Sequence, residues 1–226
     1  MNNTKKSNKR VGIIFVVIGA VLVLSALLLF VYNLYDDYRA GEEADVLLDD
    51  IKIAIAQKKE AEQSIVTEES VYIEESFEVS EESEESAPLP EEMPLVEIDG
   101  YEYIGYITFP DFDRELPVMA EWDYKRLKKA PCRYIGSSRT DDLVIAAHNN
   151  KRHFGILSSL KTGSEVIFTD MDGIVNRYRL MKEPETFAPD AVDAVQNSGY
   201  DLVLYTCTPG GANRVVVFCD RVPEDE

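Results

Sequence analysis

The sequence predicts a mainly β fold, a barrel or a sandwich, carried behind one membrane-spanning helix. Three observations support this prediction. From about residue 98 onward, short apolar runs alternate with turn residues, and only two short segments have a helical pattern. Near the N-terminus, residues 11–34 contain no charged side chain. Many short strands with few helices favour a closed or two-layered β structure over an α/β layer fold.

Eight runs in the C-terminal part have the composition of strands, and turn residues such as those of MDG and TPGGAN separate several of them. The runs are, in order, YIGYITFP, ELPVMAE, PCRYIGS, DLVIAAH, SEVIFTDMDG, NRYRLMKEPETF, DLVLYTC and RVVVFCDRV. The two helical candidates are WDYKRLKKA and FGILSSL, and no internal repeat is apparent. Residues 98–226 are therefore expected to form one compact domain.

Residues 11–34, VGIIFVVIGAVLVLSALLLFVYNL, are long enough to cross a hydrocarbon core of about 30 Å as a helix. A helix buried in a soluble domain does not need to be apolar on every side over such a length. A cleaved signal peptide is the stronger alternative, but its apolar stretch usually spans only about 7–15 residues and ends at a small-residue cleavage site. The sequence after the run offers at best a weak site. We therefore expect an uncleaved signal anchor.

The charges on the two sides of this span predict its orientation. Residues 1–10 carry Lys5, Lys6, Lys9 and Arg10 and no acid, whereas acidic residues begin directly after the span. Lys and Arg favour the cytoplasmic side of a membrane. The sequence thus predicts a single-pass protein of the cell membrane, with residues 1–10 in the cytoplasm and the C-terminal domain extracellular.

Two segments separate the span from the predicted domain. Residues 35–59 have apolar positions at helical spacing and are expected to form a juxtamembrane helical stalk. Residues 60–97 contain fourteen Glu and no Lys or Arg, so we expect a disordered acidic linker. Without these acids the net charge of the chain changes from −19 to −5. The acidity therefore belongs to the linker, and no basic surface suggests a nucleic acid as partner.

The stretch DLVLYTCTPGGANRVVVFCDRV, residues 201–222, predicts a hairpin with Cys207 and Arg214 at the same end. A guanidinium beside a thiol favours the thiolate and can also stabilise an oxyanion. A thiol enzyme also needs a group that transfers protons. His148 ends the run DLVIAAH, where a barrel strand delivers a side chain to the rim, and His153 follows in a loop or helix start. Each residue alone is more often structural, but together Cys207, Arg214 and His148 are candidate catalytic residues.

Strand alternation makes a further prediction for the cysteines. It places Cys207 and Tyr205 on one face of their strand. If Arg214 faces the same groove, Cys219 points to the interior and is expected to be packed rather than reactive. An exported domain permits a disulfide between Cys132 and Cys219, but the sequence does not fix the distance between them.

Taken together, these motifs resemble the sortases, the cysteine transpeptidases of Gram-positive cell envelopes. The pattern of that family is Thr-Leu-x-Thr-Cys on a strand, an Arg a few residues on, and an upstream His at a strand end. This chain has VLYTC at 203–207, Arg214, and AAH at 146–148. The resemblance runs from about Gly105 in IGYITFP, through ELPVM, to CDRV. It departs at Val203, where the family often has Thr.

The resemblance implies an eight-stranded sortase-type β-barrel over residues 98–226 and a transpeptidation through a thioacyl enzyme. Cys207 would attack an LPXTG-like C-terminal sorting signal of an exported protein, His148 would move the protons, and Arg214 would hold the substrate and the oxyanion. The residues expected to help bind the substrate are Tyr205, Thr206 and Asn149. An amine of the cell-wall precursor, or a lysine of a pilin subunit, would then accept the acyl group. No metal and no organic cofactor is required for these steps.

Within the family, the sequence favours a class B or class D-like enzyme that anchors surface proteins. Pilin-polymerising sortases commonly carry a second membrane segment near the C-terminus, whereas this sequence ends at VPEDE, just after the last predicted strand. Three alternatives stay open: a pilin-polymerising sortase, another cysteine peptidase or hydrolase of the cell envelope, and a catalytically silent β-domain that binds envelope components. A hydrolase would share the cysteine and the histidine but would not need Arg214 at its hairpin position.

Overall fold

The structure, a computed structural model, describes residues 3–73, 90–191 and 195–223, and it consists of two units, residues 1–39 and residues 40–226. Helix α1 (Asn3–Ile73) supplies the described part of the first unit and the start of the second. Among the described residues, Gly12–Tyr35 is the one helical stretch long and apolar enough to cross a membrane, and its apolar side chains are exposed. These bounds lie within one residue of the predicted span.

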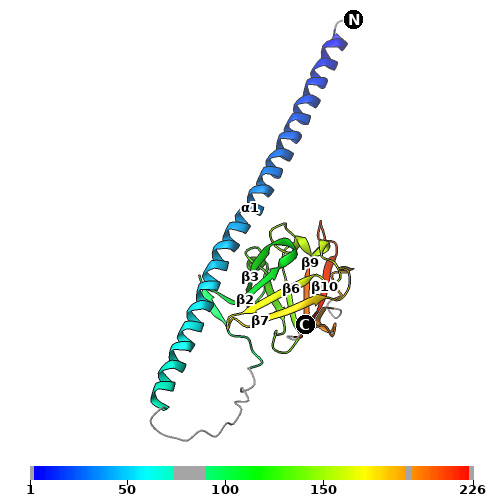
Figure 1. The fold of residues 1–226 in the computed structure, drawn as a ribbon. Coiled ribbons are helices and arrows are strands. Elements are labelled where there is room, and N and C mark those ends of the chain that lie inside the picture. The colour runs from blue at the N-terminus through cyan, green and yellow to red at the C-terminus, as the bar shows by residue number, and fades with distance from the viewer. Residues whose placement is uncertain (1–2, 74–89, 192–194, 224–226) are drawn as a thin grey trace. The chain divides into compact units, whose positions relative to one another are not determined.

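The second unit contains a closed eight-stranded β-barrel, which confirms the predicted fold (Figure 1). Around the barrel the strands follow the order β2-β3-β4-β5-β9-β10-β7-β6, and β6 pairs with β2 to close it. Two short strands lie outside this ring: β1 extends the sheet beside β2, and β8 pairs with β10. The strands are β1 (Val96–Ile98), β2 (Tyr101–Phe109), β3 (Arg114–Met119), β4 (Cys132–Ile135), β5 (Leu143–Ala146), β6 (Glu165–Asp170), β7 (Val175–Leu180), β8 (Glu185–Phe187), β9 (Leu202–Cys207) and β10 (Arg214–Arg221).

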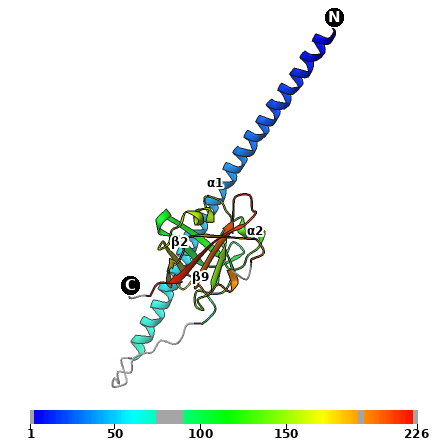
Figure 2. The same ribbon diagram turned by 90° about the vertical axis from the view of Figure 1, so that its right-hand side faces the viewer.

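Three short helical segments connect these strands: η1 (Pro110–Phe112), α2 (Tyr124–Leu127) and η2 (Phe154–Ser159). The last two occupy the two segments with a predicted helical pattern. In α2 the side chain of Asp123 accepts hydrogen bonds from the backbone N–H groups of Lys125 and Arg126, both at 2.7 Å, which is the usual role of an N-cap carboxylate. Figure 2 shows the side of the barrel on which α2 and β9 lie.

The barrel interior is filled by alternate side chains of the strands, as the period of two requires. On β9, Leu202 and Leu204 belong to the interior cluster, whereas Val203 packs on the outer face. On β10, Val217 and Cys219 point inward. The same alternation therefore decides which side chains of this hairpin are left for the outer surface.

The C-terminal half of α1 packs on the outside of the barrel. Ile51 and Ile55, four residues apart, are 0% and 8% exposed, and they share a buried cluster with Tyr103, Met119 and Met171. Two lysines of the helix add ion pairs to the barrel, Lys52 with Glu115 at 2.5 Å and Lys58 with Asp172. The predicted stalk is thus helical, and part of it belongs to the folded unit.

The predicted linker over residues 60–97 differs from the structure at both ends. Helix α1 continues to Ile73, because Glu, Ala and Gln favour helix even where like charge accumulates. From Pro90 the chain lies against the barrel: Met93 is 4% exposed, and the carbonyl of Glu91 accepts a hydrogen bond of 2.8 Å from the Ser137 hydroxyl. Residues 74–89, the rest of that prediction, lie outside the described residues.

One strand was absent from the predicted set, and one predicted strand is divided. Strand β1 forms a tight hairpin with β2, in which Asp99 and Gly100 are the two loop residues with φ of 51° and 75°. An Asp-Gly pair strongly indicates a hairpin. Here most of the strand before it falls within the Glu-rich segment that was predicted to be a linker. The run NRYRLMKEPETF forms both β7 and β8, because the sequence between Leu180 and Glu185 includes a proline.

Candidate active site

The β9–β10 hairpin brings Cys207 and Arg214 face to face. The two strands are antiparallel, and Arg214 is the direct partner of Cys207 in their register. The loop between them is closed by hydrogen bonds of 2.9 and 3.0 Å that link Thr208 with Asn213. Gly210 and Gly211 have φ of 83° and 77°, a backbone conformation that glycine adopts without a steric cost. The TPGGAN turn therefore fixes the arginine opposite the thiol.

His148 reaches the same end of the barrel because β5 and β9 are parallel. Ala146 of β5 is paired with Tyr205 of β9, so the chain beyond each strand emerges on the same side. The hydroxyl of Thr206, which is 3% exposed, donates a 2.8 Å hydrogen bond to the carbonyl oxygen of Ala147. This bond joins the residue before His148 to the residue before Cys207.

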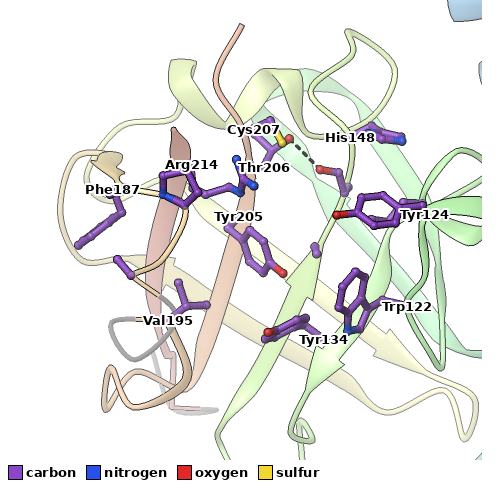
Figure 3. Close-up of a pocket in the computed structure, with 16 residues that line it drawn as sticks. Trp122, Tyr124, Tyr134, His148, Phe187, Val195, Tyr205, Thr206, Cys207 and Arg214 are labelled. Atoms are coloured by element: carbon purple, nitrogen blue, oxygen red, sulfur yellow. Dashed lines mark hydrogen bonds between the residues drawn. The ribbon is translucent and has the colours of Figure 1, made fainter. Parts of the chain in front are cut away.

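A pocket with a volume of about 220 Å³ lies against the outer face of these strands. Cys207, His148 and Arg214 all line it, and Figure 3 shows Cys207 between Arg214 on one side and His148 on the other. The remaining lining residues are Trp122, Tyr124, Leu127, Tyr134, Ala146, Ala147, Phe187, Ala188, Pro189, Ala191, Val195, Tyr205 and Thr206. The pocket is therefore mainly apolar, with its three polar candidates at one end.

Four aromatic rings form one wall of the pocket. Tyr205 meets Tyr134 edge to face, with ring centroids 5.6 Å apart. Tyr134 meets Trp122 at 5.4 Å, and Trp122 meets Tyr124 at 6.1 Å. Tyr124 and Trp122 are 77% and 41% exposed, so large rings stand open at the mouth. Edge-to-face contacts of this kind hold aromatic side chains in defined orientations.

The three polar side chains differ in how they are held. Burial lowers the pKa of His148, and the positive charge of Lys128 lowers that pKa further, so the imidazole is neutral at neutral pH. Nη1 of Arg214 donates to the carbonyl oxygens of Gly211 and Asn213, at 3.2 and 3.1 Å. Within the described residues no hydrogen bond joins Cys207 to His148.

The three residues expected to help bind a substrate have different positions. Tyr205 and Thr206 line the pocket, but the hydroxyl of Thr206 is engaged with Ala147. Asn149 is not among the residues that line this pocket. Its side-chain oxygen instead lies beside Gly155, within 3.3 Å of where a Cβ on that glycine would stand.

Sequence reasoning missed most of the pocket walls. It did not single out Trp122, Tyr124 and Tyr134, nor the lining residues Phe187, Ala188, Pro189, Ala191 and Val195. The one tryptophan of the chain, placed beside a tyrosine in EWDYKRLKK, was the available signal.

The other two cysteines are buried and free. Cys219 is enclosed in the barrel interior, as alternation predicted, and Cys132 belongs to the cluster that contacts α1. Burial raises the pKa of Cys132 to about 12 and raises that of Cys219 as well, so both stay protonated. Cys207 is the one partly exposed thiol of the chain. In the described part of the chain, no group of three His, Cys, Asp or Glu side chains is arranged to hold a metal ion.

Residues 107–222, just over half of the chain, match the family model of the sortase domain. No curated protein matches the chain in sequence. Among solved structures, the sortase C1 of GBS pilus island 1 is 22% identical with a TM-score of 0.46; the match covers 54% of this chain and 64% of that one. This chain thus spans slightly less than two thirds of that protein.

Two further solved structures are similar to a comparable extent. Sortase C1 from Streptococcus agalactiae is 27% identical with a TM-score of 0.49, and the match covers 57% of this chain and 72% of that one. Clostridium perfringens sortase C, solved with the C-terminal cell wall sorting motif, is 23% identical with a TM-score of 0.47. That match covers 54% of this chain and 71% of the other.

Proposed function

This chain belongs to the sortase family of cysteine transpeptidases, and we propose that Cys207, His148 and Arg214 carry out its reaction on an LPXTG-like sorting signal. The observation that carries the proposal is the convergence of these three side chains at one end of one apolar pocket. The register of β9 with β10 sets Arg214 opposite Cys207, and the parallel pairing of β5 with β9 brings His148 to the same end of the barrel. No other partly exposed thiol competes for the role.

In the first half-reaction the sulfur of Cys207 attacks the carbonyl carbon of a threonine in the sorting signal. The new C–S bond forms a tetrahedral oxyanion, and the amide C–N bond then breaks. His148 is neutral at the start, so it takes the proton of the Cys207 thiol as the sulfur attacks, and the imidazolium then gives this proton to the departing amine. The product is a thioester between Cys207 and the substrate protein, with the C-terminal fragment released.

The guanidinium of Arg214 stabilises the oxyanion in this step. It stands opposite Cys207 across the hairpin, and its bonds to Gly211 and Asn213 use only one of its nitrogens. A planar fork of N–H donors can hold the substrate carbonyl and the developing charge together. Preorganised donors of this kind cost no reorganisation during the reaction.

In the second half-reaction a primary amine attacks the thioester. The new N–C bond forms as the C–S bond breaks, His148 receives the proton of the amine and passes it to the departing sulfur, and the thiol of Cys207 and the neutral imidazole are restored. The low pKa of His148 suits this step, because a neutral imidazole is available to accept the proton. We propose an amine of the cell-wall precursor as the acceptor.

The arrangement along the chain supports action at the outer face of a cell membrane. Helix α1 includes the apolar stretch Gly12–Tyr35, with basic residues before it and acids after it. We propose that this stretch anchors the protein, with residues 1–10 in the cytoplasm and the barrel exported. Exported proteins with sorting signals would then meet the pocket beside the membrane they have crossed.

The test is formation of the thioester on Cys207. The full chain in an uncharged detergent is incubated with an LPXTG-like peptide, and intact-mass and peptide mass spectrometry are used to find a covalent adduct. We expect the acyl fragment on Cys207 in the native protein and none in Cys207→Ala. Addition of triglycine should then yield a peptide joined to glycine. A native protein that forms no adduct contradicts the proposal, and an adduct that is only hydrolysed in the presence of the amine points to a cysteine hydrolase.

A further inference from the structure

Basic side chains gather on the side of the pocket where His148 lies. Residues 98–226 contain 15 Lys and Arg but 21 Asp and Glu, so the domain as a whole is acidic. Six of those 15 basic residues nevertheless lie within two short segments, residues 125–129 and residues 151–152. The first segment contains α2 and its C-terminal end, and the second follows His148 by three residues.

The pocket lies next to both segments. Tyr124 and Leu127 of α2 line it together with His148, and Figure 3 labels Tyr124 and His148 in this view of the pocket. Lys125 and Lys128 directly follow these two lining residues. Lys128 is also near enough for its charge to affect the protonation of His148. The positive charge therefore borders the part of the pocket where proton transfer takes place.

Several of the cations are already engaged elsewhere. Arg126 forms ion pairs with Asp123 at 2.6 Å and Glu121 at 3.5 Å. Arg126 and Lys129 also lie over the ring of Tyr101, at 5.9 and 5.5 Å from its centroid. These two side chains are turned toward the barrel wall and are not counted as part of the basic rim.

Three lysines differ from these and form what we call the basic rim: Lys125, Lys128 and Lys151. All three are exposed. Within the described residues their side chains make no hydrogen bond and no ion pair, whereas the neighbouring Arg152 is 4.0 Å from Asp45. Lys125 and Lys128 thus follow pocket-lining residues of α2, and Lys151 lies in the turn after His148. Three ammonium groups without an ion pair among the described residues are therefore carried by segments next to the pocket and produce a local positive potential in an acidic domain.

The basic rim lies on the side from which the acceptor must approach. His148 gives its proton to the departing amine and later takes a proton from the incoming amine, so both amines occupy the same place relative to the imidazole. Figure 3 shows His148 on one side of Cys207 and Arg214 on the other. The oxyanion thus lies toward Arg214, and the acceptor enters past α2 and the turn after His148.

We propose that Lys125, Lys128 and Lys151 select acceptor amines that carry anionic groups, carboxylates or phosphates, close to the amine. This inference rests on the proposed function of the site. The rim attracts the anionic part of the acceptor, and it also favours the neutral form of the amine over the ammonium form, because a nearby positive charge opposes protonation. Only the neutral amine can form the N–C bond to the thioester carbonyl.

The expected size of the effect is modest for each lysine. An exposed ion pair changes an equilibrium by about twofold to fivefold, and salt screens it. Three pairs acting together give a preference of about tenfold for an acidic acceptor over a neutral one at low salt. The preference should shrink at high salt, whereas a preference based on shape would not.

The experiment compares acceptors on enzyme that is already acylated. The full chain in an uncharged detergent is loaded with an LPXTG-like peptide, and amidated acceptors are added that begin with Gly-Gly and continue with two Glu, two Gln, two Lys or two phosphoserines. The rate of transfer is measured for each at low and high salt. The native protein, Lys128→Gln, the triple variant Lys125→Gln, Lys128→Gln, Lys151→Gln and the control Lys161→Gln are compared. Lys161 is an exposed lysine that pairs with Glu183 and does not line the pocket.

We expect the native protein and the Lys161 variant to prefer the Glu or the phosphoserine acceptor over Gln, and Gln over Lys. The triple variant should lose most of this preference, and Lys128→Gln part of it. The faster of the Glu and phosphoserine acceptors shows whether the lysines prefer carboxylates or phosphates. Equal rates with Glu, Gln and Lys in the native protein, or a preference that survives in the triple variant, overturn the inference. If no thioester forms on Cys207 at all, it is the proposed function that fails.

Discussion

The side chain that most sharply tests the mechanism is Arg214. Its fixed position opposite Cys207 assigns it the oxyanion in the proposed reaction. Lysine at this position preserves the charge but not the planar pair of donors, and loss of one oxyanion donor typically lowers a rate by about 10² to 10³. We expect Arg214→Lys to slow acylation of Cys207 at least tenfold and Arg214→Ala to slow it more, with an unchanged thermal midpoint.

The measurement for Arg214 is the single-turnover rate of thioester formation with a sorting-signal peptide. A matched control is Arg177→Lys, because Arg177 is a strand arginine that is exposed and paired with Glu165 at 2.8 Å, away from the pocket. If Arg214→Lys acylates at the native rate, the arginine is a solvated charge at a strand end.

A second residue, His153, makes a prediction about acid stability. It is fully buried, and burial, together with the positive charges of His148 and Arg114, lowers its pKa to about 4. The unfolded chain binds the proton near pH 6.5, so between that pH and about pH 4 the unfolded state holds more protons than the folded state. The contribution of His153 to the free energy of unfolding is therefore fully present above about pH 6.5. It falls by about 3 kcal/mol as the pH decreases from about 6.5 to about 4.

The free energy of unfolding in urea, measured from pH 7 to pH 4, tests this prediction. In His153→Phe the ring is retained without a titrating group, so the slope of stability against pH should flatten whatever the packing change does to its absolute value. An unchanged slope would mean that other groups account for the acid response. The chain without its apolar span, residues 40–226, is the material for these measurements.

At the same scale, the sequence predicted the positions of the three candidate catalytic residues better than the shape of the pocket around them. Cys207 and Arg214 are neighbours through a local hairpin, and a short turn with two glycines is enough to indicate that. His148 needed only the end of an apolar run. Trp122 and Tyr134, by contrast, follow the parallel pairing of β3 with β4, in which Met119 lies opposite Cys132, and this pairing is not visible in either segment alone.

At the scale of the elements, α1 contributes to the barrel as well as to the predicted anchor. Ile51 is fully buried against Tyr103 and Met119, whereas Ile53, two residues on, is 54% exposed. Truncating a buried Ile to Ala typically costs about 2 to 5 kcal/mol. We therefore expect Ile51→Ala to lower the free energy of unfolding by that amount and Ile53→Ala to change it by less than about 0.5 kcal/mol.

Urea unfolding of residues 40–226, followed by intrinsic fluorescence, distinguishes the two variants. Equal effects of Ile51→Ala and Ile53→Ala would mean that this part of α1 does not pack on the barrel in solution. The cluster around Ile51 also includes Leu127, a residue of the pocket wall. Loss of the helix contact should therefore weaken binding of the donor peptide as well as stability.

The elements also show where the sequence was uninformative. Acidic composition indicated disorder throughout residues 60–97, yet Met93 lies in the barrel interior cluster and β1 pairs with β2. A single buried methionine and a three-residue strand do not alter the average composition of a Glu-rich segment. Tertiary contacts that depend on one or two side chains are not visible in a compositional argument.

At the scale of the whole molecule, the distribution of charged and apolar residues along the chain predicts where the protein lies in the cell. The structure shows the β-barrel, and the match of residues 107–222 to the sortase domain shows the family. The subclass, class B or class D-like, stays a prediction from the sequence.

The predicted topology can be tested on intact cells without wall, where the two faces of the membrane are distinguishable. Because Lys5, Lys6, Lys9 and Arg10 precede the apolar stretch and acids follow it, the N-terminus should stay in the cytoplasm and the barrel outside. External protease should remove the barrel and leave a membrane-bound fragment that still carries an N-terminal tag. A cytoplasmic protein that stays intact shows that the membrane is sealed. Survival of the barrel contradicts the orientation, and its release into the medium without protease indicates a cleaved signal peptide instead of an anchor.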